Sequence, residues 1–346
     1  MLPVIWFCII AVMIAIYVVL DGFDLGAGIV HLGVARTEDE RRAVLKSIGP
    51  VWDGNEVWLL AAGGALYFAF PALYASSFSG FYLPLMMVLW LLILRGSAVE
   101  FRNHFDNRVW KPLWDVVFCF ASALLAIFFG AALGNVVCGV PLDASGDFFL
   151  PLWTNWQPGP NPGILDWYTV TVGVFAFLTL AQHGALWVAY KTMDAVRSRA
   201  RGVARLAWFG VALLTIVVTI FSFQIRPGLA ASYQSMPAGY VFPALALTGL
   251  LGVFFYWRQE HDLRAFLASS LFIIGMLTSL VFGVFPNVLP ANDPTLSLTI
   301  RNAAAPDYGL RIGLIWFVPG ILLALSYNAF LYRKFAGRIG LGDGGH

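Results

Sequence analysis

Residues 3–33, PVIWFCIIAVMIAIYVVLDGFDLGAGIVHLG, form an apolar run that carries two aspartates and a histidine near its end. A membrane-spanning helix needs about 20 predominantly apolar residues, and this run is longer. No Lys or Arg precedes the run and no small-residue cleavage site follows it. We therefore interpret it as a retained helix rather than a signal peptide.

The composition of the whole 346-residue chain also indicates a membrane protein. Hydrophobic residues make up 60% of the chain and charged residues 12%, against roughly 25% charged residues in a soluble domain. The net charge of +2 gives no support for nucleic-acid binding. The three cysteines form no CxxC or CxxCH motif, and Walker, GxSxG and HExxH motifs are missing. Covalent haem, structural zinc, hydrolysis and nucleotide chemistry therefore find no support.

Further apolar runs follow along the chain, and together they predict nine transmembrane helices. The runs are 3–33, 50–70, 78–99, 113–136, 166–190, 204–225, 239–257, 265–286 and 310–333. A lipid-exposed backbone must satisfy its own hydrogen bonds, so each run is expected to be helical. No low-complexity linker divides the chain. The prediction is an all-α, polytopic membrane protein in which residues 1–346 form a single integral membrane domain. We expect two four-helix bundles plus one additional helix.

Basic residues alternate between the connections. The odd-numbered connections and the C-terminal tail hold 18 of the 21 Lys and Arg residues, and the even-numbered connections hold three. Cytoplasmic connections of membrane proteins carry the excess of Lys and Arg. The pattern predicts a multi-pass protein with its N-terminus outside and its C-terminus in the cytoplasm.

Ionisable residues within the first run are candidates for function. Asp21, Asp24, Gly28 and His31 are separated by three or four residues, so they share one helix face. A charge at the centre of a membrane helix costs roughly 2.5–3.5 kcal/mol on insertion scales. The face suits a carboxylate relay for protons or cations. The alternative is a tight packing seam in which the acids pair with basic residues.

A second pair of acids, Asp53 and Glu56, stands at the start of the second run with Asn55 between them. Their spacing directs both carboxylates to one side of a helix, and two acids on one side raise each other's pKa. That property suits groups which take up and release protons. The alternative is that the helix dipole simply favours negative charge at this end.

A third polar group, at the end of the third run, contains Arg95, Glu100, Arg102 and His104. Arg95 lies deepest, and we expect it to be the counter-ion of an acid on one of the first two helices. The remainder is equally consistent with a solvated helix end. Asp115 suggests a dipole or interface role. His183 is either a haem ligand or a hydrogen-bonded packing residue.

Long stretches of the chain resemble subunit II of cytochrome bd-type quinol oxidases. The stretches are DGFDLGAG, ERR followed by SIGPVWDGNEVWL, AAGGALYFAFPALYASSFSGFYLP, RGSAVEFR and, near the end, FPNVLP with SLTIRNAAA. The resemblance covers most of the chain. It implies a complex in the bacterial cytoplasmic (inner) membrane that reduces oxygen to water with electrons from quinol.

In this family, subunit I is the partner that carries the quinol site, two b-type haems and one d-type haem. The resemblance therefore implies that this chain binds no haem itself and has no catalytic or metal site. Some members have a small accessory subunit, and some hold a structural quinone in subunit II. Membrane lipid surrounds the complex.

Acids that match Asp21 and Asp53 are implicated in a proton path in the family. From the residues and the resemblance together, we predict a proton pathway through Asp21, Asp24, Asp53, Glu56 and Glu100, supported by Arg95, Asn55 and His31. Two of these positions depart from some relatives, because Glu56 stands where they have Gln and Glu100 where they have Asp. A proton- or cation-coupled secondary transporter and a haem-binding subunit that uses His183 remain the alternatives.

Overall fold

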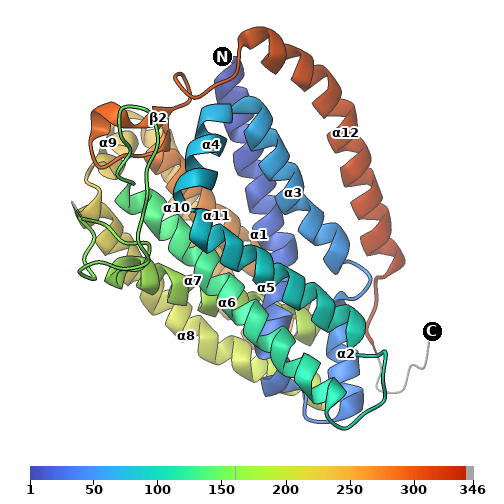
Figure 1. Ribbon diagram of the computed structural model, residues 1–346. Coiled ribbons are helices and arrows are strands. Elements are labelled where there is room, and N and C mark those ends of the chain that lie inside the picture. Colours follow the sequence, from blue (N-terminus) through green and yellow to red (C-terminus); the bar gives the residue numbers. More distant parts are fainter. Residues whose placement is uncertain (160, 340–346) are drawn as a thin grey trace.

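The computed structural model describes residues 1–159 and 161–339. It consists almost entirely of helices that run between two ends of the molecule (Figure 1). The helices are α1 (Leu2–Val34), α2 (Glu38–Ile48), α3 (Trp52–Ala69), α4 (Pro71–Gly80), α5 (Tyr82–Phe101), α6 (Trp110–Cys138), α7 (Trp167–Lys191), α8 (Asp194–Ile225), α9 (Gly228–Ser235), α10 (Val241–Arg258), α11 (Asp262–Val284) and α12 (Asp307–Lys334), with 3-10 turns η1 (Pro237–Tyr240) and η2 (Pro294–Leu296).

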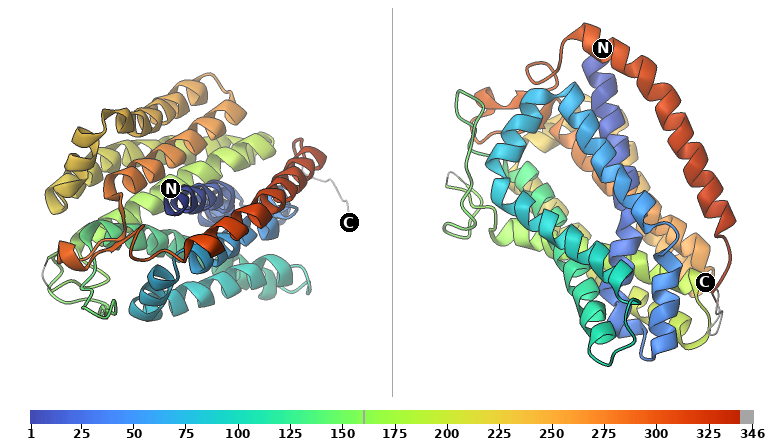
Figure 2. Two further views of the ribbon diagram at one scale, coloured as in Figure 1. Left: turned by 90° about the horizontal axis from the view of Figure 1, so that it is seen from above. Right: turned by 45° about the vertical axis from the view of Figure 1, so that its right-hand side comes forward.

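The predicted all-α, polytopic membrane fold is confirmed. Within the described ranges, eight helices are long and apolar enough to cross a bilayer, and the bent pair α3–α4 makes nine when it is counted as one span. Helices α1, α3, α5 and α6 form one group, and α7, α8, α10 and α11 form a second. The groups meet where α7 packs on α1 and α6. Helix α12 is the additional helix, and it stands on the opposite side of the molecule from α10 (Figure 2).

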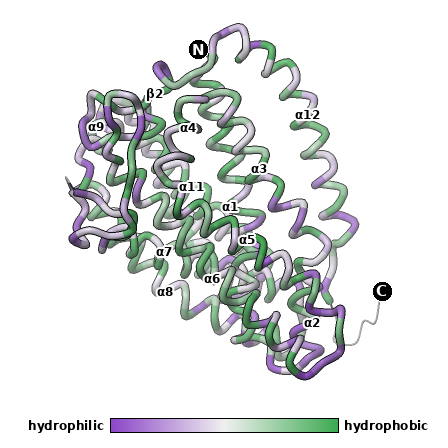
Figure 3. Tube along the Cα trace, viewed as in Figure 1, coloured by the Kyte–Doolittle hydropathy of each residue, from purple (hydrophilic) through white to green (hydrophobic). Residues whose placement is uncertain are grey.

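Hydropathy follows this architecture. Hydrophobic residues run along the helices, whereas hydrophilic residues gather at their ends and in the connections (Figure 3). At about 1.5 Å per residue, the 33 residues of α1 exceed the roughly 30 Å of hydrocarbon in a bilayer. Helix α1 is therefore longer than the hydrocarbon is thick, and α2 packs against it.

Three features differ from the prediction. The connection after α1 contains the helix α2, which begins with a capping box formed by Thr37 and Glu40. The connection left between the predicted runs 50–70 and 78–99 is instead occupied by the helix α4, bent by 120° from α3, because Pro71 cannot continue the α3 hydrogen-bond ladder. Helix α8 begins at Asp194 rather than at 204. Its first turns are rich in arginine, so they do not belong to the apolar run that marked the predicted start.

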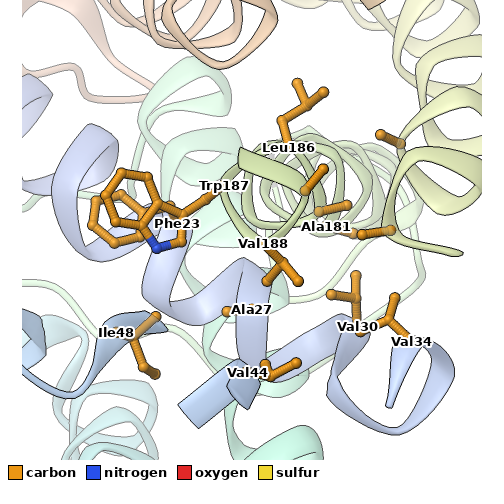
Figure 4. Close-up of a cluster of buried hydrophobic side chains, with 14 of the residues drawn as sticks. Phe23, Ala27, Val30, Val34, Val44, Ile48, Ala181, Leu186, Trp187 and Val188 are labelled. Atoms are coloured by element: carbon orange, nitrogen blue, oxygen red, sulfur yellow. The ribbon is translucent and has the colours of Figure 1, made fainter. Parts of the chain in front are cut away.

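The centre of the molecule is the crossing of α1 and α7. A Cβ atom on Gly26 would collide with the backbone of Gly184, and one on Gly184 would collide with the backbone of Gly26 and Ala27. Glycine at both positions lets the two backbones touch. Beside this crossing, Phe23 stacks on Trp187 with ring centroids 4.1 Å apart, within the buried cluster of Figure 4.

The end of the molecule that holds the N-terminus is closed by irregular segments. Strands β1 (Asn287–Leu289) and β2 (Leu298–Thr299) pair antiparallel, and Val140 forms a bridge with Ala291. Asp166 caps α7 by accepting hydrogen bonds from the first-turn amides. The loops are thus ordered against the helix ends.

Candidate functional site

Arg95 is the centre of a buried ion cluster between α1, α3 and α5. Its Nη1 donates to Asp21 Oδ1 at 2.6 Å and its Nη2 donates to Glu56 Oε2 at 2.8 Å. The side chains of Arg95 and Asp21 are sealed from solvent, whereas Glu56 retains 23% exposure. The ring of Trp52 packs against the guanidinium, with its centroid 5.9 Å from Cζ. The expected pairing of Arg95 with an acid from the first two predicted helices is confirmed.

A second set of polar groups continues from this cluster toward α12. Asn55 Nδ2 donates to Asp24 Oδ2 at 2.7 Å, and the phenol of Tyr332 donates to Asn55 Oδ1 at 2.8 Å. Asp24 and Asn55 are buried. Asn55 therefore uses both ends of its amide to join the N-terminal helix to the last helix.

Several polar atoms of the cluster have no hydrogen-bond partner within the described part of the chain. They are the hydroxyl of Tyr17, Oδ2 of Asp21 and Oδ1 of Asp24. The carboxylates of Asp21 and Glu56 bind the guanidinium of Arg95, and the buried carboxylate of Asp24 lies near enough to interact with it electrostatically. An excess of buried negative charge is costly unless a further positive charge compensates it, and a proton can supply that charge.

Asp115 is the centre of a neighbouring cluster. This cluster is closer to the end of the molecule opposite the N-terminus, where the connections rich in Lys and Arg lie (the arginine-rich end). Oδ1 of Asp115 lies 2.8 Å from His31 Nε2 and accepts from Arg102 Nε at 2.6 Å, and its Oδ2 accepts from Arg41 Nη1 at 3.1 Å. Arg102 also binds both carboxylate oxygens of Glu38. His31 follows Asp24 by seven residues, so about 10 Å of helix separates the two clusters.

The acids of α2, outside the membrane spans, are held ionised by basic neighbours. Burial raises the pKa of the Glu40 carboxyl. Hydrogen bonds from the backbone amide of Arg36 and from Arg199 outweigh this effect, so the pKa lies below its ordinary value. Burial also raises the pKa of Glu38, and Arg102 and Lys111 reverse the shift in the same way. These contacts fasten α2 to α5 and α8.

Asp53 and Glu100 stand apart from both clusters. Both residues are exposed, and neither carboxylate forms an ion pair with any residue in the described ranges. Asp53 lies in the first turn of α3. Glu56 lies one turn further on, and its side chain reaches Arg95. The structure thus gathers Asp21, Asp24, Glu56, Arg95 and Asn55, places His31 in the adjacent cluster, and leaves Asp53 and Glu100 at the surface.

Sequence reasoning missed three members of these clusters. Asp115 was assigned only a dipole or interface role. Its partners come from α1, α2 and the end of α5, and the sequence alone does not show that these elements meet at Asp115. Tyr17 and Tyr332 were not considered, since a tyrosine within an apolar run is common. The only available signal was spacing, because Tyr17 lies one turn before Asp21 on the same helix.

His183 does not suit a haem iron. Its Nε2 donates to the carbonyl of Val19 at 3.0 Å, and its Nδ1 lies 2.6 Å from Ser269 Oγ. The ring also stacks on Phe266 at a centroid distance of 4.6 Å. Both nitrogens are therefore engaged in a fully packed site, so the packing interpretation of His183 fits the geometry and a ligand role does not.

An apolar cavity of about 580 Å³ lies beside the ion cluster, between α1 and helices α6 to α11. The residues that line it include Tyr17, Tyr168, Tyr233 and Gln234. Tyr17 lines the cavity and also adjoins Asp21. This tyrosine is thus the link between the cavity and the buried acids.

The fold and the clusters define a class: an all-α, multi-pass membrane protein with ionised side chains sealed between its helices. A family model described as cytochrome bd terminal oxidase subunit II matches residues 2–335. The chain therefore belongs to the cytochrome bd terminal oxidase subunit II family.

Individual relatives agree with this assignment. The chain is 31% identical to the probable cytochrome oxidase subunit 2 of Haemophilus influenzae, across 97% of this chain and 94% of that protein. It is 29% identical to the cytochrome bd-I ubiquinol oxidase subunit 2 of Escherichia coli, with the same two coverages. The cytochrome bd ubiquinol oxidase subunit 2 of Bacillus subtilis is 28% identical, with 95% of each chain covered.

A solved structure shares the fold. The bd oxidase from Geobacillus thermodenitrificans matches with a TM-score of 0.76 over 96% of this chain and 98% of that chain, at 18% sequence identity. The arrangement of helices described above is therefore common to a bd oxidase chain.

Proposed function

We propose that this chain is the non-haem subunit II of a quinol:oxygen oxidoreductase in the inner membrane. The observation that carries the proposal is the family match over nearly the whole chain, together with relatives named as subunits of ubiquinol oxidases. Two b-type haems and one d-type haem would reside in subunit I. Haem there supplies the oxygen chemistry, and this chain supplies shape and a route for protons.

The proton route that we propose begins at the arginine-rich end. Asp53 and Glu100 are exposed carboxylates that can exchange protons with water, and Glu56 is partly exposed beside Arg95. From Glu56 the route passes to Asp21, since the same guanidinium holds both carboxylates. Asp24, oriented by Asn55, adjoins this pair. Unpartnered oxygens on Asp21 and Asp24 offer positions for the moving proton.

The proposed direction rests on charge and depth. The arginine-rich ends face the cytoplasm under the positive-inside rule, which leaves the N-terminus outside. Asp21 lies 13 residues before the end of α1, or about 20 Å from the arginine-rich end and farther from the other. His31 and the Asp115 cluster support the route by fixing this end of α1.

The face on which we propose that subunit I packs includes α12. None of the most apolar window of α12 is buried within this chain, and Trp316 and Leu323 are 76% and 73% exposed. On α3, Leu60 is 73% exposed. A partner helix can cover these side chains, and it would also enclose the Tyr332–Asn55–Asp24 connection. A small accessory subunit is a further proposed partner of the complex.

The apolar cavity is the proposed site of a structural quinone. Its volume and almost wholly apolar lining suit an isoprenoid compound, and the amide of Gln234 can bind a carbonyl. Solvent extraction of the purified complex should then yield quinone in excess of that bound at the substrate site of subunit I.

Purification of the tagged chain from membranes tests the central proposal. We expect a larger haem-bearing polypeptide to accompany it and the pair to consume oxygen with quinol. A haem absorbance band in the isolated chain would contradict the non-haem assignment. Isolation without a haem-bearing partner, with proton-coupled solute uptake in proteoliposomes, would instead support a secondary transporter.

A further inference from the structure

The arginine-rich end carries a small groove between α8 and α10, with a volume of only about 10 Å³, that is distinct from the ion clusters. It is lined by Ala204, Arg205, Trp208, Phe209, Val253, Phe254 and Trp257. Three guanidinium groups stand over its aromatic walls: those of Arg201 and Arg205 over Trp257, and that of Arg258 over Phe254. Arg205 Cζ lies 5.6 Å from the centroid of Trp257, and Arg258 Cζ lies 4.4 Å from the centroid of Phe254.

Arg205 and Arg258 are exposed and lack a carboxylate partner within residues 1–159 and 161–339. The nearby acids are already compensated. Asp262 binds Arg197 and Arg201, and Glu260 lies 3.7 Å from Arg197. The groove therefore has an uncompensated positive charge on its rim.

The aromatic walls of the groove are fixed in place. Trp208 Nε1 donates to the carbonyl of Leu250 at 2.9 Å and the indole stacks on Phe254. Trp257 Nε1 donates to the carbonyl of Arg201 at 3.1 Å. Because both indoles are held by hydrogen bonds, the arginines rest on a preformed surface rather than on mobile side chains.

An apolar stripe continues from the groove along α8 toward the middle of the membrane. Side chains spaced by three or four residues form it, and each is more than half exposed: Phe209, Leu213, Ile216 and Ile220. Helix α10 lies on the opposite side of the molecule from α12 (Figure 2). The groove and stripe consequently face away from the surface assigned to subunit I.

We propose that this groove binds an anionic phospholipid. Arg205 and Arg258 contact the phosphodiester headgroup, Trp208 and Trp257 lie at the level of the headgroup boundary, and one acyl chain follows the stripe on α8. A basic rim above an apolar groove matches the two parts of such a lipid, and interfacial tryptophans are typical at this depth. The site requires the helices to span a bilayer but is independent of the proton route.

Native mass spectrometry of the assembled complex tests the site. The probes are dioleoyl phosphatidylglycerol and dioleoyl phosphatidylcholine, which share acyl chains and differ in headgroup charge. We expect the complex to retain the anionic lipid preferentially. Each of Arg205→Gln and Arg258→Gln should weaken that retention roughly fivefold, since one basic residue near the surface contributes about 1 kcal/mol. Binding of phosphatidylcholine should change little.

Arg301→Gln is the matched control, because it removes the same charge from an exposed position at the other end of the molecule. Equal loss of the anionic lipid from this variant would overturn the proposal. Displacement of the bound lipid by millimolar glycerol phosphate would also overturn it, because a site for a free phosphate would then explain the arginines. Arg258→Lys keeps the charge and should retain most of the binding if folding is intact.

Discussion

Asp115 shows how one buried carboxylate holds three elements together. It is sealed from solvent and contacts His31, Arg41 and Arg102, which come from α1, the α2 region and the end of α5. Arg102 is also fully buried. Removing the acid therefore takes the paired carboxylate from His31 and Arg41 and leaves Arg102 with Glu38 alone.

Replacing Asp115 with Asn should destabilise the protein by about 3–5 kcal/mol, the usual cost of removing one partner from a buried pair. The measurement is the thermal unfolding of the detergent-solubilised complex and the yield of monodisperse material. Asp106→Asn is the control, because Asp106 also pairs with a basic residue, Lys111, but is exposed. Equal stability of the two variants would show that the Asp115 cluster does not hold the helices.

At the residue scale, the sequence showed which ionisable residues lie inside the protein better than it showed which of them contact each other. Asp21, Asp24 and Arg95 were identifiable because charged groups within apolar runs are expensive, and all three are buried together. Whether Asp53 or Glu56 meets Arg95 depends on the rotation of α3 against α5, and in the structure it is Glu56. Helical spacing places the two carboxylates near each other but does not say which of them meets Arg95.

Among the elements, the crossing of α1 and α7 is the most restrictive contact. Gly26 and Gly184 bring the backbones together, and the neighbouring side chains are fully packed. Overpacking in such a core typically costs about 1–3 kcal/mol. A methyl group at this position must separate the two four-helix groups.

Gly184→Ala should therefore lower the unfolding temperature and the yield of assembled complex. The control is Gly202→Ala on α8, where a new Cβ would meet no atom within 4 Å. Limited proteolysis of the two variants side by side measures the difference. Comparable resistance of both to the protease would mean that α1 and α7 can separate without consequence.

The contribution of the α2 acid Glu40 to the stability of the folded protein depends on pH. The pKa of the Glu40 carboxyl is lower in the folded protein than its ordinary value of 4.5. Its stabilising contribution is therefore fully present above pH 4.5 and is lost as the pH falls through the lower folded value. The docking of α2 on Arg199 should weaken in that acidic range.

Unfolding temperatures of the wild-type protein and Glu40→Gln, measured across this range, check the pH dependence. The difference between the two proteins should be constant above pH 4.5 and should shrink at lower pH. A difference that stays unchanged into strongly acidic solution would show that Glu40 is not held ionised by its neighbours.

The sequence predicted the long helices and missed the short ones for a physical reason. A helix that spans the lipid requires a long apolar run, so each spanning helix could be identified in the sequence. Helix α2 is polar and lies outside the hydrocarbon, and its one signal was the capping box at Thr37 and Glu40. Helix α4 starts at Pro71, in the connection that the apolar runs left unassigned, although proline is favoured at the first helical position.

Across the whole molecule, the two polar ends and the apolar middle divide the functions that we propose. The arginine-rich end holds the ion clusters and the lipid groove, and the apolar cavity lies beside Tyr17 between them and the opposite loops. Helix α12 leaves one face open for a partner. A chain of this kind can deliver protons to a neighbouring haem subunit without holding a cofactor in the route.

Oxygen consumption by the assembled oxidase containing Asp21→Asn tests this account most directly. The variant keeps the shape of the side chain but removes the carboxylate that Arg95 binds. We expect turnover with quinol to fall roughly a hundredfold or more, the scale of a lost acid–base group, while the haem spectrum per complex stays at the wild-type level. Asp147→Asn, on the exposed loop at the other end, should leave turnover unchanged. Wild-type turnover in a fully assembled Asp21→Asn complex would contradict the proton route through this chain.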